Sequence, residues 1–299
     1  MSYTIPIKNF KSNIRNLSVG NIEVNSANSL TFMKAEHGRM NPLLAIEVLM
    51  NIPKNYSSVL EEYWGDIIFD MPKWVKQVEK INPDIVALKF NINEENEIDK
   101  SINLLKEILT LTNKPFIITG SNKKNLDVLL LPRLAEILDR PCIIGIAEQD
   151  TYKSLVDIVS KNNHAIIART PIDINLAKEL NILLTEGGIS PDKILIDTNM
   201  ASLGYGLDYG YSIMERVKLS GLEGDEMLNF PIIAFVGEEA WKAKEARVAD
   251  YASHYGLFTS RAIAWESATA TSLMLAGADI LVLWHPEVLN QLKSFMGGV

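Results

Sequence analysis

The chain has 299 residues, of which 47% are hydrophobic and 22% are charged, a composition typical of folded globular proteins rather than disordered or fibrous ones. Its 29 basic residues are outnumbered by 37 acidic ones, and the formal net charge of -8 argues against binding to nucleic-acid phosphates. No stretch is long and apolar enough to cross a bilayer, and the opening segment lacks the apolar core of a signal peptide. We therefore expect a cytoplasmic protein that does not bind membranes.

The first 42 residues lack the strand and helix rhythm of the rest of the chain. Apolar residues alternate on both sides of Gly20 and Asn21, which predicts a small β-hairpin. We expect residues 1–42 to form an N-terminal hairpin extension that caps the N-terminal end of the domain that follows.

Eight short runs rich in β-branched residues follow and are expected to be strands. They span residues 43–50, 83–90, 115–120, 141–147, 164–170, 193–199, 231–237 and 279–285. Four of them begin at proline (Pro83, Pro115, Pro141 and Pro231), where the missing N–H removes no interior hydrogen bond of a sheet.

Helical patterns lie between most of these runs. Apolar residues recur at steps of three and four over residues 97–112, 124–138, 150–161, 172–184, 207–222 and 262–276. Eight alternations predict an α/β fold, a (β/α)8 TIM barrel over residues 43–299, because closure gives every strand a covering helix and leaves no sheet edge. An open, doubly wound sheet is the alternative, since a count of strands does not establish closure.

Functional residues of barrels lie on the loops after the strands, at the C-terminal face. The residues in these positions are Asn91, Ser121, Asn122, Glu148, Thr170, Asp197, Thr198, Asn199, Gly237, Glu238, Trp284 and His285. Among the tryptophans, Trp284 is best placed to face a ligand.

The loop after the sixth run contains Gly204, Gly206 and Gly210. Their spacing and their place in the chain do not fit the dinucleotide fingerprint, which requires G-x-G-x-x-G at a first strand. These glycines either let the backbone approach a flat ligand or simply form a helix-entry turn, and the sequence leaves both interpretations open.

The residue types of built-in metal and nucleophile sites are sparse. Cys142 is the single cysteine, so the chain alone can form neither a disulfide nor a four-thiolate iron-sulfur site, and we expect Cys142 to be buried in a strand. The four histidines show no metal-binding spacing, so no metal ligand is predicted. Glu148 and Asp197 could act as an acid and a base if they packed together, but structural roles are the default, and we predict no catalytic residue.

Several long segments resemble the small (delta) subunit of the corrinoid iron-sulfur protein of the CO dehydrogenase/acetyl-CoA synthase system. They are PIDINLAKELNILLTEGGI (171–189), LGYGLDYGYSIMERVKL (203–219), VGEEAWKAKEA (236–246) and AWESATATSLMLAGADILVLWHPE (264–287). Weaker likeness extends the resemblance over nearly the whole barrel. The family usually reads D-P-T-T-G-A-L-G-Y-G after the sixth strand, whereas this chain reads DTNMASLGYG over residues 197–206, so its contacts there are expected to differ in detail.

The resemblance implies a barrel that pairs with a larger subunit, which holds the four-iron cluster and the main corrinoid-binding domain. Cobalt, reduced to Co(I), accepts a methyl group from a methyl-tetrahydropterin through a separate methyltransferase and delivers it to acetyl-CoA synthase. The small subunit is then a lid and scaffold, with a corrinoid shared with the large subunit as its cofactor. The residues that we expect near the corrinoid are Asn91, Ser121, Asn122, Asp197, Thr198, Asn199, Gly204, Gly206, Gly237, Trp284 and His285.

Two enzymatic alternatives remain. A free-standing pterin-dependent methyltransferase would use the same fold and could bind the methyl donor through Asp197 and Asn199. An aldolase-like barrel would need a strand-end lysine for a Schiff base, and Lys89 is the candidate.

Overall fold

The computed structural model describes residues 9–27, 30, 41–199 and 206–297. In this part of the chain, eight parallel strands form one sheet in the order β8-β7-β6-β5-β4-β3-β10-β9. The strands are β3 (Leu43–Leu49), β4 (Ile85–Lys89), β5 (Phe116–Thr119), β6 (Ile143–Ala147), β7 (Ala165–Arg169), β8 (Ile194–Asp197), β9 (Ile233–Ala234) and β10 (Ile280–Leu283). The two ends of this order meet where the Ile196 N–H donates to the Pro231 carbonyl at 2.9 Å. The sheet is therefore a nearly closed (β/α)8 barrel, as the sequence predicts.

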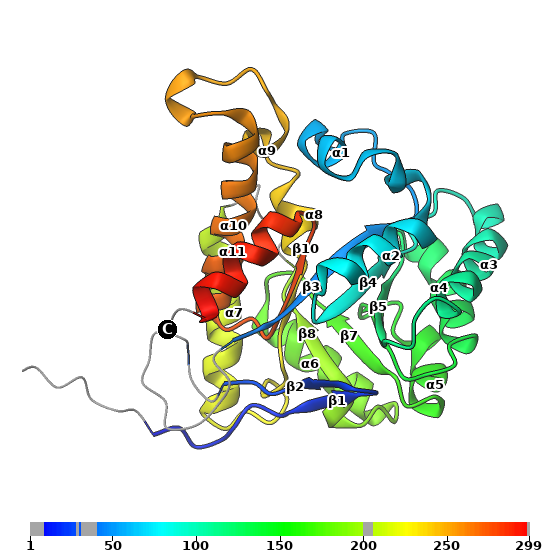
Figure 1. The fold of residues 1–299 in the computed structure, drawn as a ribbon. Helices are drawn as coiled ribbons and strands as arrows, with labels where there is room; N and C mark the ends of the chain where they lie inside the picture. Colours follow the sequence, from blue (N-terminus) through cyan, green and yellow to red (C-terminus); the bar gives the residue numbers. More distant parts are fainter. Residues whose placement is uncertain (1–8, 28–29, 31–40, 200–205, 298–299) are drawn as a thin grey trace, which may run out of the picture.

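Helices surround the strands on the outside of the barrel (Figure 1). The α-helices are α1 (Ser58–Trp64), α2 (Met71–Ile81), α3 (Ile98–Leu109), α4 (Lys124–Glu136), α5 (Lys153–Lys161), α6 (Ile174–Glu186), α7 (Leu207–Leu222), α8 (Val236–Ala240), α9 (Lys244–Arg247), α10 (Phe258–Ala276) and α11 (Pro286–Gly297). Short 3-10 turns are η1 (Gly65–Phe69), η2 (Glu95–Glu97), η3 (Pro191–Lys193) and η5 (Ser253–Tyr255). No helix among the described residues has the length and apolarity that crossing a membrane requires.

Local sequence explains how these helices begin and which face they bury. Asp173 caps α6, because its carboxylate accepts hydrogen bonds from the backbone N–H groups of Asn175 and Leu176. On α3, the residues at steps of three and four are buried against the sheet: Ile98, Ile102, Leu105 and Ile108.

The predicted hairpin is present and fills the N-terminal end of the barrel. Strands β1 (Leu17–Val19) and β2 (Ile22–Val24) pair antiparallel, and their inward side chains join the apolar cluster inside the barrel. Gly20 turns the chain with a φ of 61°, and a Cβ there would lie 3.4 Å from Cγ of Pro115, the residue just before β5. The Lys193 ammonium also donates to the Ser18 carbonyl at 2.5 Å. The hairpin thus closes one end of the barrel and leaves the C-terminal end for a site.

One predicted strand is wrong beyond its first half. The run 231–237 was expected to be extended throughout, but β9 ends at Ala234 and α8 begins at Val236. The Ile232 N–H donates a hydrogen bond to the Asp279 carboxylate at 2.8 Å. A side chain thus accepts a bond that a neighbouring strand would accept if β9 were longer. Gly237 lies within α8, and a Cβ there would meet the Trp284 ring at 2.4 Å. Only glycine therefore lets this turn pack directly on β10.

Candidate functional site

Five polar side chains form a layer inside the C-terminal end of the barrel. Each of the five lies two positions after a residue of the apolar cluster inside the barrel. Alternate residues of a strand point to the same side, so these polar side chains also point into the barrel. They are Glu47, Lys89, Thr119, Arg169 and Asp197. Each is at or near the end of a strand, and all but Arg169 are almost fully buried.

Hydrogen bonds and ion pairs connect this layer across the mouth of the barrel. The Lys89 ammonium lies 2.5 Å from Glu238 Oε2, and Asn122 Nδ2 donates to Glu238 Oε1 at 2.8 Å. Arg169 Nη1 donates to Asn122 Oδ1 at 3.1 Å, and Arg169 Nε donates to Asp197 Oδ2 at 2.6 Å. We call these residues, Lys89, Glu238, Asn122, Arg169 and Asp197, the mouth network.

The charges of the mouth network are balanced in pairs. Burial alone would raise the pKa of Glu238, but the cations of Lys89, Lys242 and Arg169 outweigh it and hold that pKa at about 2. Glu238 is therefore an anion, and a hydrogen-bond acceptor, at neutral pH. Glu47 differs, because burial raises its pKa against the opposing effect of Lys89.

A second buried carboxylate fastens the outer elements around the mouth. Glu266, on α10, accepts hydrogen bonds from the backbone N–H groups of Trp284 and His285 at 2.7 and 3.1 Å and from Trp241 Nε1 at 2.8 Å. Burial raises the pKa of Glu266 to about 7 although these three donors oppose the shift. Glu266 thereby holds the end of β10 against α8, the helix that carries Glu238.

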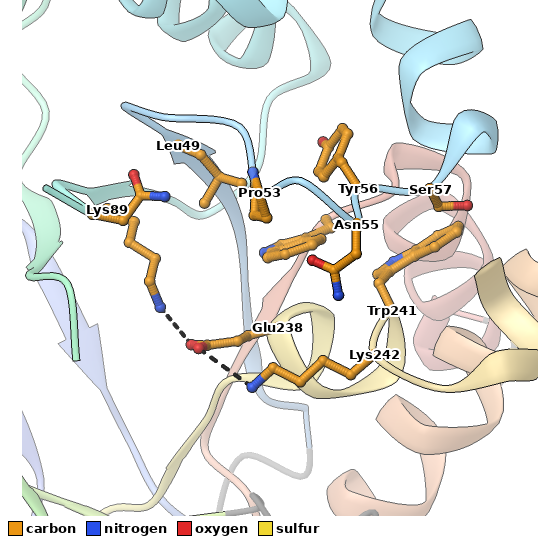
Figure 2. A pocket seen from close by; sticks show the side chains of 11 residues that line it. Leu49, Pro53, Asn55, Tyr56, Ser57, Lys89, Glu238, Trp241 and Lys242 are labelled. Atoms are coloured by element: carbon orange, nitrogen blue, oxygen red, sulfur yellow. Dashed lines mark hydrogen bonds and ion pairs between the residues drawn. The ribbon is translucent and has the colours of Figure 1, made fainter. Parts of the chain in front are cut away.

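A small cavity of about 100 Å³ opens beside the mouth network (Figure 2). Its walls come from the end of β3 and the loop after it, from α8 and from the ends of β4 and β10. The lining residues are Leu49, Pro53, Asn55, Tyr56, Ser57, Lys89, Asn91, Glu238, Trp241, Lys242 and Trp284. An apolar cavity of about 150 Å³ holds one benzene molecule, so this space holds a group of only a few heavy atoms.

Four of the residues predicted just after the strands come together here. Asn122, Asp197 and Glu238 belong to the mouth network, and Trp284 lines the cavity. Asn91 also lines the cavity, but its amide is already bonded to both backbone groups of Asn51, at 2.9 and 2.5 Å. A position just after a strand thus correctly predicted that these five residues lie at the mouth of the barrel.

The remaining predicted residues lie apart from the cavity. Ser121 donates to Asp127, and Asn199, with a φ of 52°, donates its N–H to Asp197 Oδ1 at 2.9 Å. Gly206 precedes α7 with a φ of 101°.

Three more of these residues are buried. They are Thr198, Gly237 and His285. His285 packs 4.7 Å from Tyr63, between ring centroids, and burial lowers its pKa to about 4. Gly204 lies outside the described residues, and the assignment of all these residues to a corrinoid stays a prediction.

Several residues at the mouth were not predicted from the sequence, namely Glu47, Tyr56, Arg169, Trp241, Lys242 and Glu266. A signal existed for Glu47, a single charge within the apolar run LLAIEVL whose alternation places it inside the barrel. For Lys89, the sequence suggests only the role of a Schiff-base lysine. Its ammonium is engaged by Glu238, which does not suit a free nucleophile.

Solved structures show the same fold at low sequence identity. Dihydropteroate synthase from Yersinia pestis superposes with a TM-score of 0.59 at 9% identity, covering 96% of this chain and 98% of that one. Dihydropteroate synthase from Xanthomonas albilineans gives a TM-score of 0.58 at 12% identity, covering 86% and 92%. Such likeness establishes the barrel and nothing about the ligand.

Sequence relatives identify the family. The acetyl-CoA decarbonylase/synthase complex subunit delta of Methanocaldococcus jannaschii is 28% identical over 272 residues, which are 87% of this chain and 65% of that protein. The subunit delta of Archaeoglobus fulgidus is 30% identical, over 86% of this chain and 60% of that protein. The chain thus spans less than two thirds of the length of these two relatives. The family model described as CO dehydrogenase/acetyl-CoA synthase delta subunit matches residues 36–292, and the chain belongs to that family.

Proposed function

We propose that this chain is the small subunit of a heterodimeric corrinoid iron-sulfur methyl carrier. In this role it helps to bind and shield a corrinoid held mainly by a larger partner subunit, which alone carries the iron-sulfur cluster. The methyl group passes from a methyl-tetrahydropterin, through a methyltransferase, to acetyl-CoA synthase in the acetyl-CoA (Wood-Ljungdahl) pathway. Membership of the delta-subunit family supports this role, because the relatives are named as subunits of an acetyl-CoA decarbonylase/synthase complex.

The observation that carries the proposal is that the barrel mouth is filled by its own side chains. Barrel enzymes keep this end open for a substrate. Here the mouth network spans it, and the cavity that adjoins the network has about 100 Å³, less than the roughly 150 Å³ that holds one benzene molecule. Asp197, the group that a pterin would need, is paired with Arg169 at 2.6 Å. These features favour a scaffold over a free-standing methyltransferase.

The residues at the mouth suit a corrinoid that lies over the barrel and not within it. A corrin ring bears amide arms around its edge, and amide arms pair well with uncharged donors and acceptors. Asn91, Asn122, Asn199 and Gly206 retain solvent exposure at this end and would hold the edge of the ring. When bound, the corrinoid supplies a cobalt centre that accepts and releases the methyl group. The chain's own task is to position the ring and to exclude water from it.

Apolar side chains at the same end of the barrel provide a surface for a partner. Phe69 and Tyr63, on the segment after β3, are 77% and 49% exposed, and Leu257, just before α10, is 79% exposed. Figure 1 shows α1 and the segment around α9 standing beyond the end of the barrel sheet. Exposed apolar surface of this kind typically marks an interaction site. It supports docking of the larger subunit over the mouth.

Calorimetric titration of the chain alone with a methyl-tetrahydropterin tests this reading against the enzyme reading. If the chain is a scaffold, the isolated chain should not bind the pterin at protein concentrations at which its complex with the larger subunit retains corrinoid. Tight binding of the pterin by the isolated chain, abolished by Asp197→Ala, would overturn the scaffold role and support the methyltransferase.

A further inference from the structure

The small cavity beside the mouth network has a definite chemical character. Its walls include the rings of Tyr56, Trp241 and Trp284, and the Tyr56 and Trp284 rings lie 5.6 Å apart between centroids. The charged groups in the lining are Glu238, Lys242 and Lys89, and Asn55, Ser57 and Asn91 add uncharged polar groups. Aromatic walls beside a few polar groups suit a small, planar polar group.

The charges at the polar end are already matched. Glu238 pairs with Lys89 at 2.5 Å, and Lys242 lies 2.6 Å from Glu239 and 3.5 Å from Glu238. An added ion would leave one charge without a counterion in a partly desolvated space, which is costly. A neutral ligand with both a donor and an acceptor avoids that cost. It could donate to the Glu238 carboxylate and accept from the Lys242 ammonium.

The volume of the cavity further limits which ligands can bind in it. A cavity of about 150 Å³ holds benzene, which has six heavy atoms, so in proportion a space of about 100 Å³ holds about four. A primary amide with its adjoining carbon has four heavy atoms, is planar, and carries both a donor and an acceptor. Figure 2 shows that Asn55 already directs a carboxamide of this kind from the rim toward Glu238 and Lys242.

We infer that this cavity is a subsite for one primary amide, and that its source is a peripheral amide arm of the corrinoid. The inference rests on the proposed function for the identity of that source. In the bound state the arm's NH2 group donates to Glu238, its carbonyl oxygen accepts from Lys242, and the rings of Trp241 and Trp284 cover its faces. Asn55 stands at the opening, so its side chain determines how deeply the arm enters.

The test uses the complex of the full chain with its larger partner subunit. Equilibrium dialysis measures binding of cobalamin and of cobalamin derivatives in which a single peripheral amide is hydrolysed to a carboxylate. For the native chain, one of these derivatives should bind at least about ten-fold more weakly, because its carboxylate would face Glu238. The other derivatives should bind like cobalamin.

A cavity-filling variant provides the second arm. Asn55 is exposed, so Asn55→Phe can place a ring in the cavity without removing a buried contact, and Lys54→Phe adds the same ring at an exposed neighbour outside the lining. Asn55→Phe should weaken cobalamin binding about ten-fold and abolish the distinction between cobalamin and the sensitive derivative. Lys54→Phe should behave like the native chain. Asn55→Leu, similar in size to asparagine, shows whether the effect comes from filling the cavity or from loss of the Asn55 amide.

Each other outcome overturns the inference in a recognisable way. Equal binding by Asn55→Phe and Lys54→Phe, or equal binding of all derivatives, removes the subsite but leaves the proposed function standing. The Asn55→Phe variant could also lose the larger subunit before any cobalamin is added. In that case the amide in the cavity belongs to a side chain of the larger subunit, and the proposal that a corrinoid arm supplies it is wrong. Absence of cobalamin binding by the native complex refutes both the subsite and the proposed function.

Discussion

Trp284 Nε1 donates a hydrogen bond to Glu47 Oε2 at 2.7 Å, although 237 residues separate the two in the sequence. The bond crosses the seam at which β10, the last strand, pairs with β3, the first strand of the barrel. Glu47 Oε1 has no hydrogen-bond partner within the described part of the chain, so the indole N–H is important for satisfying this buried carboxyl group.

Replacing the Trp284 indole should therefore lower the free energy of unfolding more than replacing an indole whose N–H makes no hydrogen bond. Trp284→Phe is expected to lower the free energy of unfolding by about 1–3 kcal/mol beyond the loss of packing, because Glu47 loses its donor. Trp74→Phe is the control, since Trp74 is also buried and its Nε1 has no partner among the described residues. Urea unfolding of both variants checks this, and equal losses would show that the Glu47 bond contributes little.

The buried pair of Lys89 and Glu238 should depend on both partners being present. Lys89→Met leaves the Glu238 carboxylate buried without its main counterion, and a loss of about 3–5 kcal/mol is expected. The double variant with Glu238→Leu should recover much of that loss, because no buried charge remains unpaired. A double-mutant cycle by chemical denaturation measures the coupling. The exposed pair of Arg133 and Asp99 serves as the control, for which at most about 1 kcal/mol of coupling is expected.

Glu266 should make stability depend on pH in a definite direction. Its folded pKa of about 7 lies above the ordinary 4.5, so between these values the folded state holds a proton that the unfolded state has released. The contribution of Glu266 to stability is thus greatest below about pH 4.5, falls by roughly 3 kcal/mol as the pH rises to 7, and is constant above that. Glu266→Gln removes this dependence, so the substitution should cost more at pH 5 than at pH 8.

His285 acts in the opposite sense, since its lowered pKa makes stability rise between about pH 4 and 6.5. That effect is common to the native chain and to Glu266→Gln, so the difference between their unfolding free energies isolates Glu266. Glu287→Gln, at an exposed position nearby, controls for the general effect of removing one acidic side chain. If Glu266→Gln also gave a constant difference from pH 5 to 8, the carboxyl would titrate normally and the buried arrangement around α10 would be wrong.

The hairpin should contribute to stability through its inward residues alone. Leu17→Ala removes a fully buried side chain from the apolar cluster inside the barrel, and a cost of about 2–5 kcal/mol is expected. Ser18→Ala changes the next residue, which is exposed and bonded to Glu23, and should cost less than about 1 kcal/mol. Thermal unfolding compares the two variants. Similar small effects would mean that the hairpin rests on the barrel without closing it.

Local patterns in the sequence are sufficient to predict most of the elements. Prolines mark the starts of several strands, and the amphipathic stretch 207–222 matches α7 at both ends. The error at 235–237 arises because a short apolar run has the same appearance in a strand and in a buried helical turn. Which of the two forms there depends on Gly237 packing against Trp284, a contact between distant parts of the chain.

The candidate site was predictable only in part. A position just after a strand is a local property, and it identified Asn91, Asn122, Asp197, Glu238 and Trp284. Glu266 lies in the middle of α10, where nothing nearby in the sequence indicates that it turns toward the end of β10. The ion pairs of the mouth network join strands through barrel closure, so no spacing within the sequence reveals them.

The central claim is that this chain covers a corrinoid held together with a larger subunit. Co-expression with that subunit, followed by size-exclusion chromatography with a visible spectrum across the eluted peak, tests it most directly. We expect a one-to-one complex with corrinoid absorption bands that neither subunit retains as strongly alone. A chain that elutes by itself while the larger subunit keeps its full corrinoid content would contradict it.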